Sequence, residues 1–460
     1  MRMAASAILT VALLLGANPY AEASALAFAD AQQFSPGYAS QVRYALLLGA
    51  TLDDRREQWA AVSFALNSVS RVRRITVPAV IDPDYRVVRW SILDYSGRNN
   101  KKYNEYLRAY ERLLDPSFVT TAVVVSTKNV VSAGAWCGPD YPSLQIACSS
   151  AAPLVRADYL VFRLTGDSPT YYAFAGVPLQ QADFLKSLGV DKAALESLLA
   201  QTEANLFVSR VTGKPRRVVR LPAPFGSVWL TQDVEDESAE KNPIRIPVDA
   251  GGVAFEFDAS EIFFSRPSGL WGTALFAAGG ERQDAVPAGI ATDRYGQTGH
   301  GEIVPLFSCL RCHEREGFAG LQDFADAQVS LPLLGFDRDA VEKLGEIHDP
   351  ERLTDSLTHD ALTNIKAVAR ATTGMMVEGD QARAMTPGEA TGALVATIER
   401  YLTPVTLAVV AREFDCTLEV ARGLVQRSND PVAIALASGG SVTRADYEVG
   451  FHTFAGGATP

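Results

Sequence analysis

The chain has 460 residues, of which 47% are hydrophobic and 21% are charged, and its formal net charge is -11. A chain of this length and composition is globular and long enough for two or three domains with substantial cores. The negative charge argues against nucleic acid as the main partner.

The N-terminus is typical of an export signal. Arg2 supplies a positive charge, residues 4–17 form an apolar run, and the sequence AEA at 21–23 offers a small-x-small cleavage site. The run is shorter than the ~20 apolar residues that a spanning helix needs, and no later segment is long and apolar enough. We therefore expect residues 1–23 to be a signal peptide and the mature protein to be periplasmic or secreted, with no membrane span.

Residues 30–300 carry patterns of both helices and strands. Apolar residues follow helical spacing from Asp53 to Val72, and a charged helix is expected from Asn99 to Leu114. One or two further helices are expected between Gln180 and Leu206. Strand-like or β-rich patterns occupy residues 75–91, 118–131, 154–164, 216–229 and 252–278. We predict a mixed α+β domain over residues 30–300.

Residues 301–460 are expected to be helical and acidic. Amphipathic helices are predicted over 340–347 and 394–402, and two more within 405–425. From Phe307 to the end of the chain, 13 Lys and Arg residues stand against 22 Asp and Glu residues. Such a surface either serves solubility alone or attracts a partner with a basic docking face.

Five cysteines are present, and two of them form a plausible local disulfide. Cys137 and Cys148 flank a loop-like stretch rich in Pro and Gly, and an exported protein meets an oxidising compartment. Cys416 lies in a helical pattern and is expected to be a buried small hydrophobe.

The remaining two cysteines belong to the sequence Cys309-Leu310-Arg311-Cys312-His313, which is the attachment signature of c-type haem. Two thiols three residues apart share one helix face and can form thioethers, and the adjacent imidazole can bind the iron. A dithiol redox site would follow a strand in a thioredoxin-like unit, and a zinc site would need a fourth ligand. Neither context is present, so we predict one covalent haem c (heme c), with His313 as the proximal iron ligand.

The sixth iron ligand is left open by the sequence. Met375, Met376 and Met385 precede the predicted helix at 394–402, which is the order of the distal loop and last helix of small cytochromes c. Filling of apolar gaps is the alternative role for each methionine. His300 lies in a glycine-bearing loop shortly before the motif and is a further candidate. The other histidines are alternatives, and they are His348, His359 and His452.

Three segments of the chain resemble a family of large secreted bacterial proteins that end in a single-haem cytochrome c region. The segments are FALNSVS at 64–70, EIFFSRPSGLWG at 261–272 and SCLRCH at 308–313, and the similarity extends from Tyr44 to Leu424. The resemblance implies haem c, with Cys309 and Cys312 as thioether sites and His313 as proximal ligand, and it implies no particular activity.

We therefore expect an α+β protein in which a mixed N-terminal α/β region is followed by an all-α cytochrome c-like haem domain over residues 301–460. The predicted function is electron transfer to or from a redox protein partner. The alternative is a peroxidase-like haem enzyme, or a haem-based binding or sensing protein, with an open sixth position.

Overall fold

The computed structural model describes most of the chain, in several stretches. The described residues are 19–113, 154–190, 204–206, 214, 216–235, 256–286, 303–313, 337–339, 341–342, 350–378, 381–413, 417–426, 429–444 and 446–447.

The N-terminal part is built on a four-stranded sheet with the order β2-β3-β1-β4. Its strands are β1 (Val42–Leu46), β2 (Ala79–Val80), β3 (Val87–Ser91) and β4 (Leu154–Arg156). All five residues of β1 are buried, because alternate side chains enter two different cores. Tyr44 packs with Ala23 and Ala27 of α2 (Pro19–Ala31) on one side of the sheet, whereas Ala45 joins the main core on the other.

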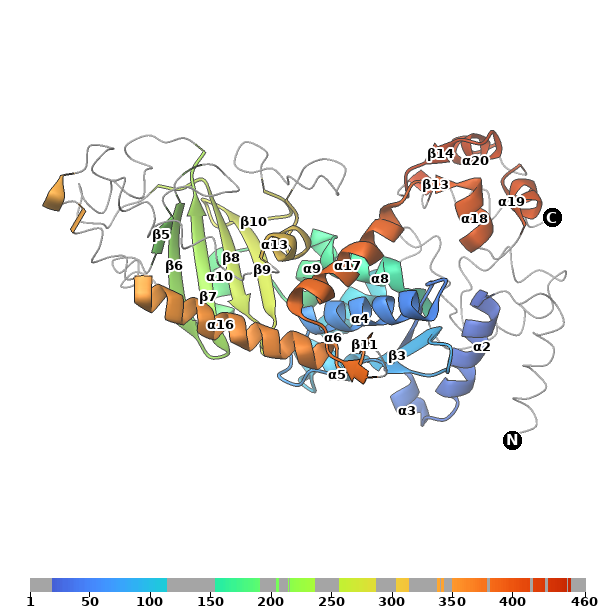
Figure 1. Ribbon diagram of the computed structural model, residues 1–460, viewed down its shortest axis with the longest axis horizontal. Coiled ribbons are helices and arrows are strands. Elements are labelled where there is room, and N and C mark those ends of the chain that lie inside the picture. The colour runs from blue at the N-terminus through green and yellow to red at the C-terminus, as the bar shows by residue number, and fades with distance from the viewer. Residues whose placement is uncertain are drawn as a thin grey trace.

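Three helices stack beside this sheet, as Figure 1 shows: α4 (Leu52–Ser68), α8 (Ala157–Thr165) and α17 (Pro387–Leu402). A capping box begins α4, in which the side chain of Thr51 accepts from Asp54 N–H and the Asp54 carboxylate accepts from Thr51 N–H. The same device, formed by Thr386 and Glu389, begins α17. The shorter helices nearby are α3 (Pro36–Ala39), α5 (Ile92–Ser96), α6 (Asn100–Leu113) and α9 (Ser168–Ala175).

A second sheet has six antiparallel strands in the order β10-β9-β8-β7-β6-β5. The strands are β5 (Ala204–Leu206), β6 (Arg216–Ala223), β7 (Gly226–Asp233), β8 (Ala259–Ser265), β9 (Trp271–Ala277) and β10 (Arg282–Gln283). Each strand pairs with its neighbour along the chain, so the sheet is a meander of local hairpins.

The register divides this sheet into two faces, because directly paired residues point to the same side. The back face is largely apolar and belongs to the main core, with Val219, Leu221, Leu230, Ile262, Phe264, Ala274 and Phe276. Phe184 of α10 (Gln181–Ser187) packs there against the rings of Phe264 and Phe276. The opposite, front face carries Arg216, Val218, Arg220, Trp229, Asp233, Glu261, Phe263 and Trp271. In Figure 1 the long helix α16 (Pro350–Ala371) crosses the sheet diagonally.

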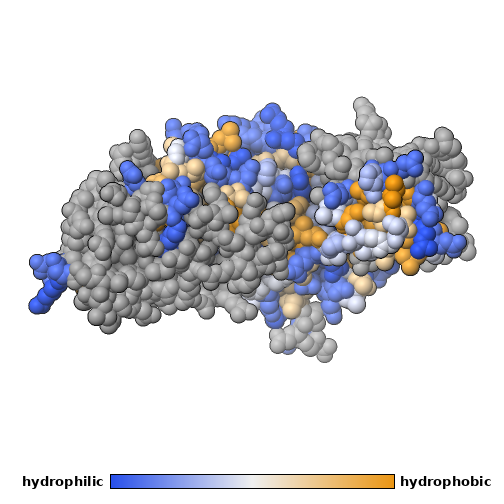
Figure 2. All heavy atoms as spheres, turned by 90° about the horizontal axis from the view of Figure 1, so that it is seen from above, coloured by the Kyte–Doolittle hydropathy of each residue, from blue (hydrophilic) through white to orange (hydrophobic). Residues whose placement is uncertain are grey.

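A small unit follows α17 and has a hydrophobic core of its own. It contains β13 (Val405–Thr406), α18 (Leu407–Glu413), α19 (Leu418–Val425), α20 (Pro431–Ala437) and β14 (Ser441–Val442). Figure 2 shows apolar side chains gathered at this end of the molecule, and Leu418, Val420 and Ile434 are the exposed ones.

The mixture of helices and sheets predicted from the sequence is confirmed, but an all-α domain after residue 301 is not shown. The main core joins α16 and α17 to residues from before residue 300, since it includes Ala367, Leu394 and Phe64. Short strands also occur in this part, with β11 (Met376–Glu378) pairing to β12 (Gln381–Arg383) and β13 pairing to β14.

Helices α4 and α6 are present with nearly the expected bounds, whereas α17 ends as predicted but begins seven residues earlier than the predicted 394–402. Strands β6 to β9 lie in or close to the two predicted strand regions, 216–229 and 252–278. The β-rich prediction for 154–164 is wrong beyond Arg156, because α8 begins at Ala157. The helical prediction is wrong at 204–206, which pair with β6 as strand β5. Among the described residues, no helix combines the length and the apolar character needed to cross a membrane.

Candidate functional site

The CxxCH motif lies on α13 (Phe307–His313), a helix of two turns that begins beside the front face of the six-stranded sheet. The N–H of Leu306 donates to the hydroxyl of Thr273 on β9 at 2.6 Å. Ser308 accepts from the N–H of Val304 at 3.1 Å, which satisfies a donor just before the helix. Leu306 has a positive φ of 64°, so the chain turns sharply into the helix at this point.

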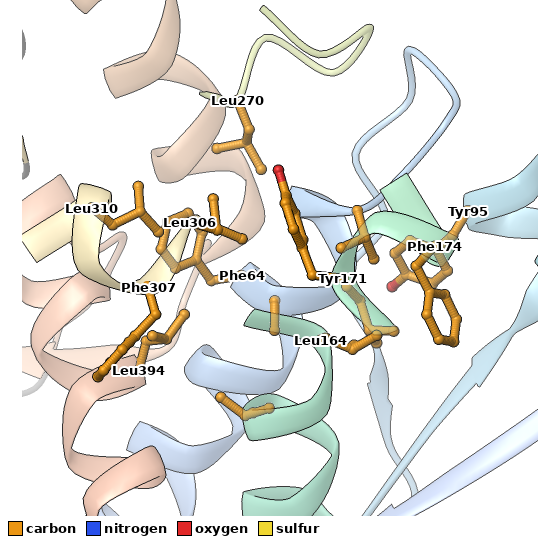
Figure 3. Packing of buried hydrophobic residues seen from close by; sticks show 14 of the residues in the cluster. Phe64, Tyr95, Leu164, Tyr171, Phe174, Leu270, Leu306, Phe307, Leu310 and Leu394 are labelled. Carbon is orange, nitrogen blue, oxygen red and sulfur yellow. The ribbon is translucent and has the colours of Figure 1, made fainter. Parts of the chain in front are cut away.

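The helix has two buried sides. Leu306, Phe307 and Leu310 point into the main core toward Phe64 and Leu394, as Figure 3 shows. Cys309 belongs to a separate group of side chains on the front face, which we call the aromatic cluster: Val218, Trp229, Phe263, Trp271 and Cys309, with Leu357 of α16 packed against them. The motif helix is therefore held between the main core and this cluster.

Two contacts join the motif directly to strand β8. The thiol of Cys309 donates to Oε1 of Glu261, with 2.9 Å between sulfur and oxygen. The ring of His313 meets the ring of Phe263 edge to face, with centroids 4.6 Å apart and an interplanar angle of 68°. Cys309 is 3% exposed and His313 is half-buried, so both ends of the motif are against protein.

A buried ion pair lies next to Glu261 on the front face. Nη2 of Arg216 is 2.6 Å from Oδ1 of Asp233 on the neighbouring strand. Burial alone would lower the pKa of Arg216, and the carboxylates of Asp233 and Glu261 together raise that pKa above its ordinary value. The next residue, Arg217, points to the back face and donates to Gln232, and burial lowers its pKa to about 10.

Helix α16 is fixed over the front face by one buried carboxylate, that of Asp360. Its Oδ2 accepts from Ser227 at 2.6 Å, from Nε1 of Trp229 at 2.9 Å and from Nε of Arg220 at 3.0 Å. Nη2 of Arg220 reaches the other oxygen at 3.2 Å. The indole of Trp229, a member of the aromatic cluster, is thus held in place by a side chain of the helix that covers it.

Helix α16 also contacts the turn between β8 and β9. Gly269 has a φ of 90°, and a Cβ at this position would lie 3.4 Å from side-chain atoms of Thr363 and Ala367 on α16. Oδ1 of Asn364 accepts from the N–H of Trp271 at 3.2 Å. The helix therefore contacts backbone as well as side chains of the sheet.

The predicted sixth ligands are distributed over the chain. Met375 and Met385 are buried in the main core, and the N–H of Met385 donates to Thr372. Met376 begins β11, which Figure 1 places well apart from α13. Thus the described contacts bring none of these methionines together with Cys309 in the aromatic cluster.

The histidine candidates are not brought to the motif by any described contact either. His359 is exposed on α16. His300, His348 and His452 lie outside the described residues, as do Cys137, Cys148 and Cys416 and the side chain of Cys312. In the described part of the chain, no group of three or more His, Cys, Asp or Glu side chains is arranged to hold a metal ion.

Sequence reasoning did not single out Glu261, Phe263, Trp229 or Asp360, although all four take part in this site. Glu261 is the one charged residue of strand β8, so this isolated acidic residue was the available signal. Asp360 had no such signal, because its partners lie more than 130 positions away.

The donors of the motif, two thiols and an imidazole, are the groups that c-type haem attachment uses. Cys309 and His313 are four residues apart, so they lie on one side of the helix, and that side meets the aromatic half of the front face. Large apolar side chains exclude water and lower the local dielectric constant, which are two means by which a protein tunes a bound haem. If haem is bound, Cys309, Cys312 and His313 would hold it.

No family model, no curated protein and no solved structure matches the chain.

Proposed function

We propose that this protein is a periplasmic or secreted c-type cytochrome that carries one haem on Cys309 and Cys312, has His313 as an axial ligand, and exchanges electrons with a redox protein. The observation that carries the proposal is the placement of the motif. Cys309 and His313 face the same aromatic wall from one two-turn helix, and the spacing of the motif matches haem attachment.

The chain's own residues have separate tasks in this proposal. Phe263, Trp229 and Trp271 form an apolar wall and keep water from the motif. Asp360 keeps Trp229 in one orientation through the indole N–H. The haem would supply reversible one-electron chemistry at its iron, and the surrounding side chains would set how strongly each oxidation state is stabilised.

The charge of the chain indicates the kind of redox partner. From Phe307 onward the chain has 22 acidic against 13 basic residues. An acidic surface attracts a partner with a basic docking face and speeds the encounter, and added salt weakens the attraction. We therefore expect electron exchange to slow as ionic strength rises.

A haem enzyme of the peroxidase type is the second candidate, and one observation favours it. Met375 and Met385 pack in the main core, apart from the aromatic cluster that contains Cys309. A haem without a strong sixth ligand can bind peroxide or another small ligand. A haem-based binding or sensing role has the same structural requirement.

The deciding experiment is maturation of the full chain in cells that attach haem c, followed by intact mass and optical spectra. We expect the mass of one haem, which is lost when both Cys309 and Cys312 are replaced by Ala. A chain without covalent haem would overturn the proposal. A low-spin ferric spectrum supports electron transfer, and a high-spin spectrum that shifts with peroxide or cyanide supports the enzyme.

Two histidine variants test the ligand. His313→Ala should leave the thioethers and change the spectrum, because the proximal imidazole is removed. His359→Ala is the matched control, since this histidine is exposed on α16, and its spectrum should equal that of the wild type. An unchanged spectrum in His313→Ala would refute the assigned role of His313.

A further inference from the structure

The spacing of side chains along strand β8 matches the spacing of side chains along helix α13. Glu261 and Phe263 are two residues apart on one face of the strand, which separates them by ~6.6 Å. Cys309 and His313 are four residues apart on one side of the helix, which separates them by ~6 Å. Glu261 contacts Cys309, and Phe263 contacts His313. The helix and the strand therefore run in the same direction, with the two ends of the motif over two successive front-face residues.

A helix of this length depends on its surroundings for its orientation. α13 has seven residues, and isolated helices shorter than ~12 residues are marginal in water. Its contacts with the main core, through Leu306, Phe307 and Leu310, are apolar and without directional preference. The contacts with β8 are directional, because one is a hydrogen bond and the other an edge-to-face ring pair.

We propose that Glu261 and Phe263 are positioning residues of the haem-attachment motif, with β8 serving as the template that fixes Cys309 and His313. Phe263 limits rotation of the imidazole about its side-chain bonds, so it sets the plane of the ring that would bind iron. Glu261 holds the thiol of Cys309 in one rotamer before a thioether forms. The relevance of these contacts to haem rests on the proposed function, whereas the contacts themselves can be tested without haem.

The first test measures the haem-free full chain. The rate of alkylation of Cys309 by a thiol reagent is followed by peptide mass, and the unfolded chain is the reference. We expect slow alkylation in the wild type and a rise of about fivefold in Glu261→Ala, the size expected for the loss of one hydrogen bond. Glu261→Gln keeps an acceptor oxygen and should stay near the wild-type rate. Alkylation in the folded wild type as fast as in the unfolded chain, or no change in Glu261→Ala, would overturn the inference.

The second test measures the matured protein by electron paramagnetic resonance of the ferric haem, which reports the orientation of the axial imidazole. Phe263→Leu should shift the resonance positions while the haem content per chain stays the same. The matched control is Phe264→Leu, the same substitution at the next residue of β8, whose side chain enters the back-face core. This control should lower stability and leave the resonances unchanged.

The outcomes separate the two proposals. A wild-type chain without haem refutes the proposed cytochrome, and the alkylation rates still decide the role of Glu261. A wild-type chain that carries haem, with identical resonances in Phe263→Leu and Phe264→Leu, overturns the positioning role of Phe263 and leaves the cytochrome in place.

Discussion

The two faces of the six-stranded sheet use alternate residues of the same strands and differ in what they carry. The back face is a largely apolar surface that shares the main core with α10. The front face combines an aromatic cluster with buried arginine–carboxylate contacts, and it receives both the motif helix and α16. Apolar packing thus dominates the back face, whereas directional contacts are concentrated on the front face, where α13 and α16 must be oriented.

The largest loss of folding stability is expected from Asp360→Ala on the front face. The substitution leaves Arg220 and the indole of Trp229 without the carboxylate that they share. Breaking a buried ion pair by removing one partner costs about 3–5 kcal/mol. Urea denaturation measures the loss, and Leu362→Ala on the same helix, where the side chain is 47% exposed, should stay within about 0.5 kcal/mol. Equal losses in both variants would contradict a special role for the front-face contacts.

Neighbouring arginines on opposite faces allow a direct comparison. Arg216→Met leaves the carboxylate of Asp233 buried without its guanidinium, and we expect a loss of about 3 kcal/mol. Arg217→Met removes the hydrogen bond to Gln232 together with a cation whose burial is costly, as its lowered pKa of about 10 indicates, so we expect a change within about 1 kcal/mol. Thermal or urea unfolding of the two variants decides the point. A larger loss of stability in Arg217→Met than in Arg216→Met would contradict the view that directional contacts matter most on the front face.

A smaller loss of folding stability is expected from Gly272→Ala on the back face. The ring of Phe264 lies over this glycine, its direct partner on the next strand, so an added Cβ would collide with the ring. Overpacking of this kind costs about 1–3 kcal/mol. Gly392→Ala is the control, because nothing lies near its Cβ position on α17, and it should stabilise the protein by about 0.5–1 kcal/mol. A neutral Gly272→Ala would show that the back face adapts more easily than its packing suggests.

The smallest effect is expected away from both faces, at the start of α17. Hydrogen bonds from Arg383 and from Thr386 lower the pKa of Glu389 to about 2. The folded-state pKa lies below the unfolded value, so the stabilisation is present above about pH 4.5 and is lost as the pH falls toward 2. Glu389→Gln should cost about 1 kcal/mol at neutral pH and flatten this acid dependence. The free energy of unfolding, measured between pH 2 and 7 for the variant and the wild type, tests this prediction. Two curves that run parallel over this range would refute it.

Patterns within one element could be predicted from the sequence. The spacing of apolar residues located α4, α6, α17 and the hairpin strands β6 to β9, because their periodicity is local. The pattern failed at α8, because most of this short helix is buried and a short apolar run fits a buried strand as well as a buried helix.

Contacts between distant elements could not be predicted in this way. The motif itself could be found, since its spacing is contiguous, but its surroundings depend on strand register and on a helix that follows it. Asp360 illustrates the difficulty, because a single Asp in an amphipathic helix is normally read as solvent-exposed, and here it is 3% exposed. The role of the methionines could not be predicted from the sequence either, because core filling and iron ligation use the same residue type.

The order of the elements along the chain has a consequence for folding kinetics. Strands β6 to β9 are joined by sequential pairings and precede α13, whereas the contacts of Asp360 close loops of more than 130 residues. Local pairings form early and long loops close late. If the chain emerges N-terminus first, as in the export proposed above, the hairpins around β8 can be complete before residues 309–313 emerge, and α16 arrives afterwards to cover them. The motif would then pass through a stage in which it is already oriented and not yet enclosed, and the proposed haem attachment, if it occurs, would have its best access in that interval.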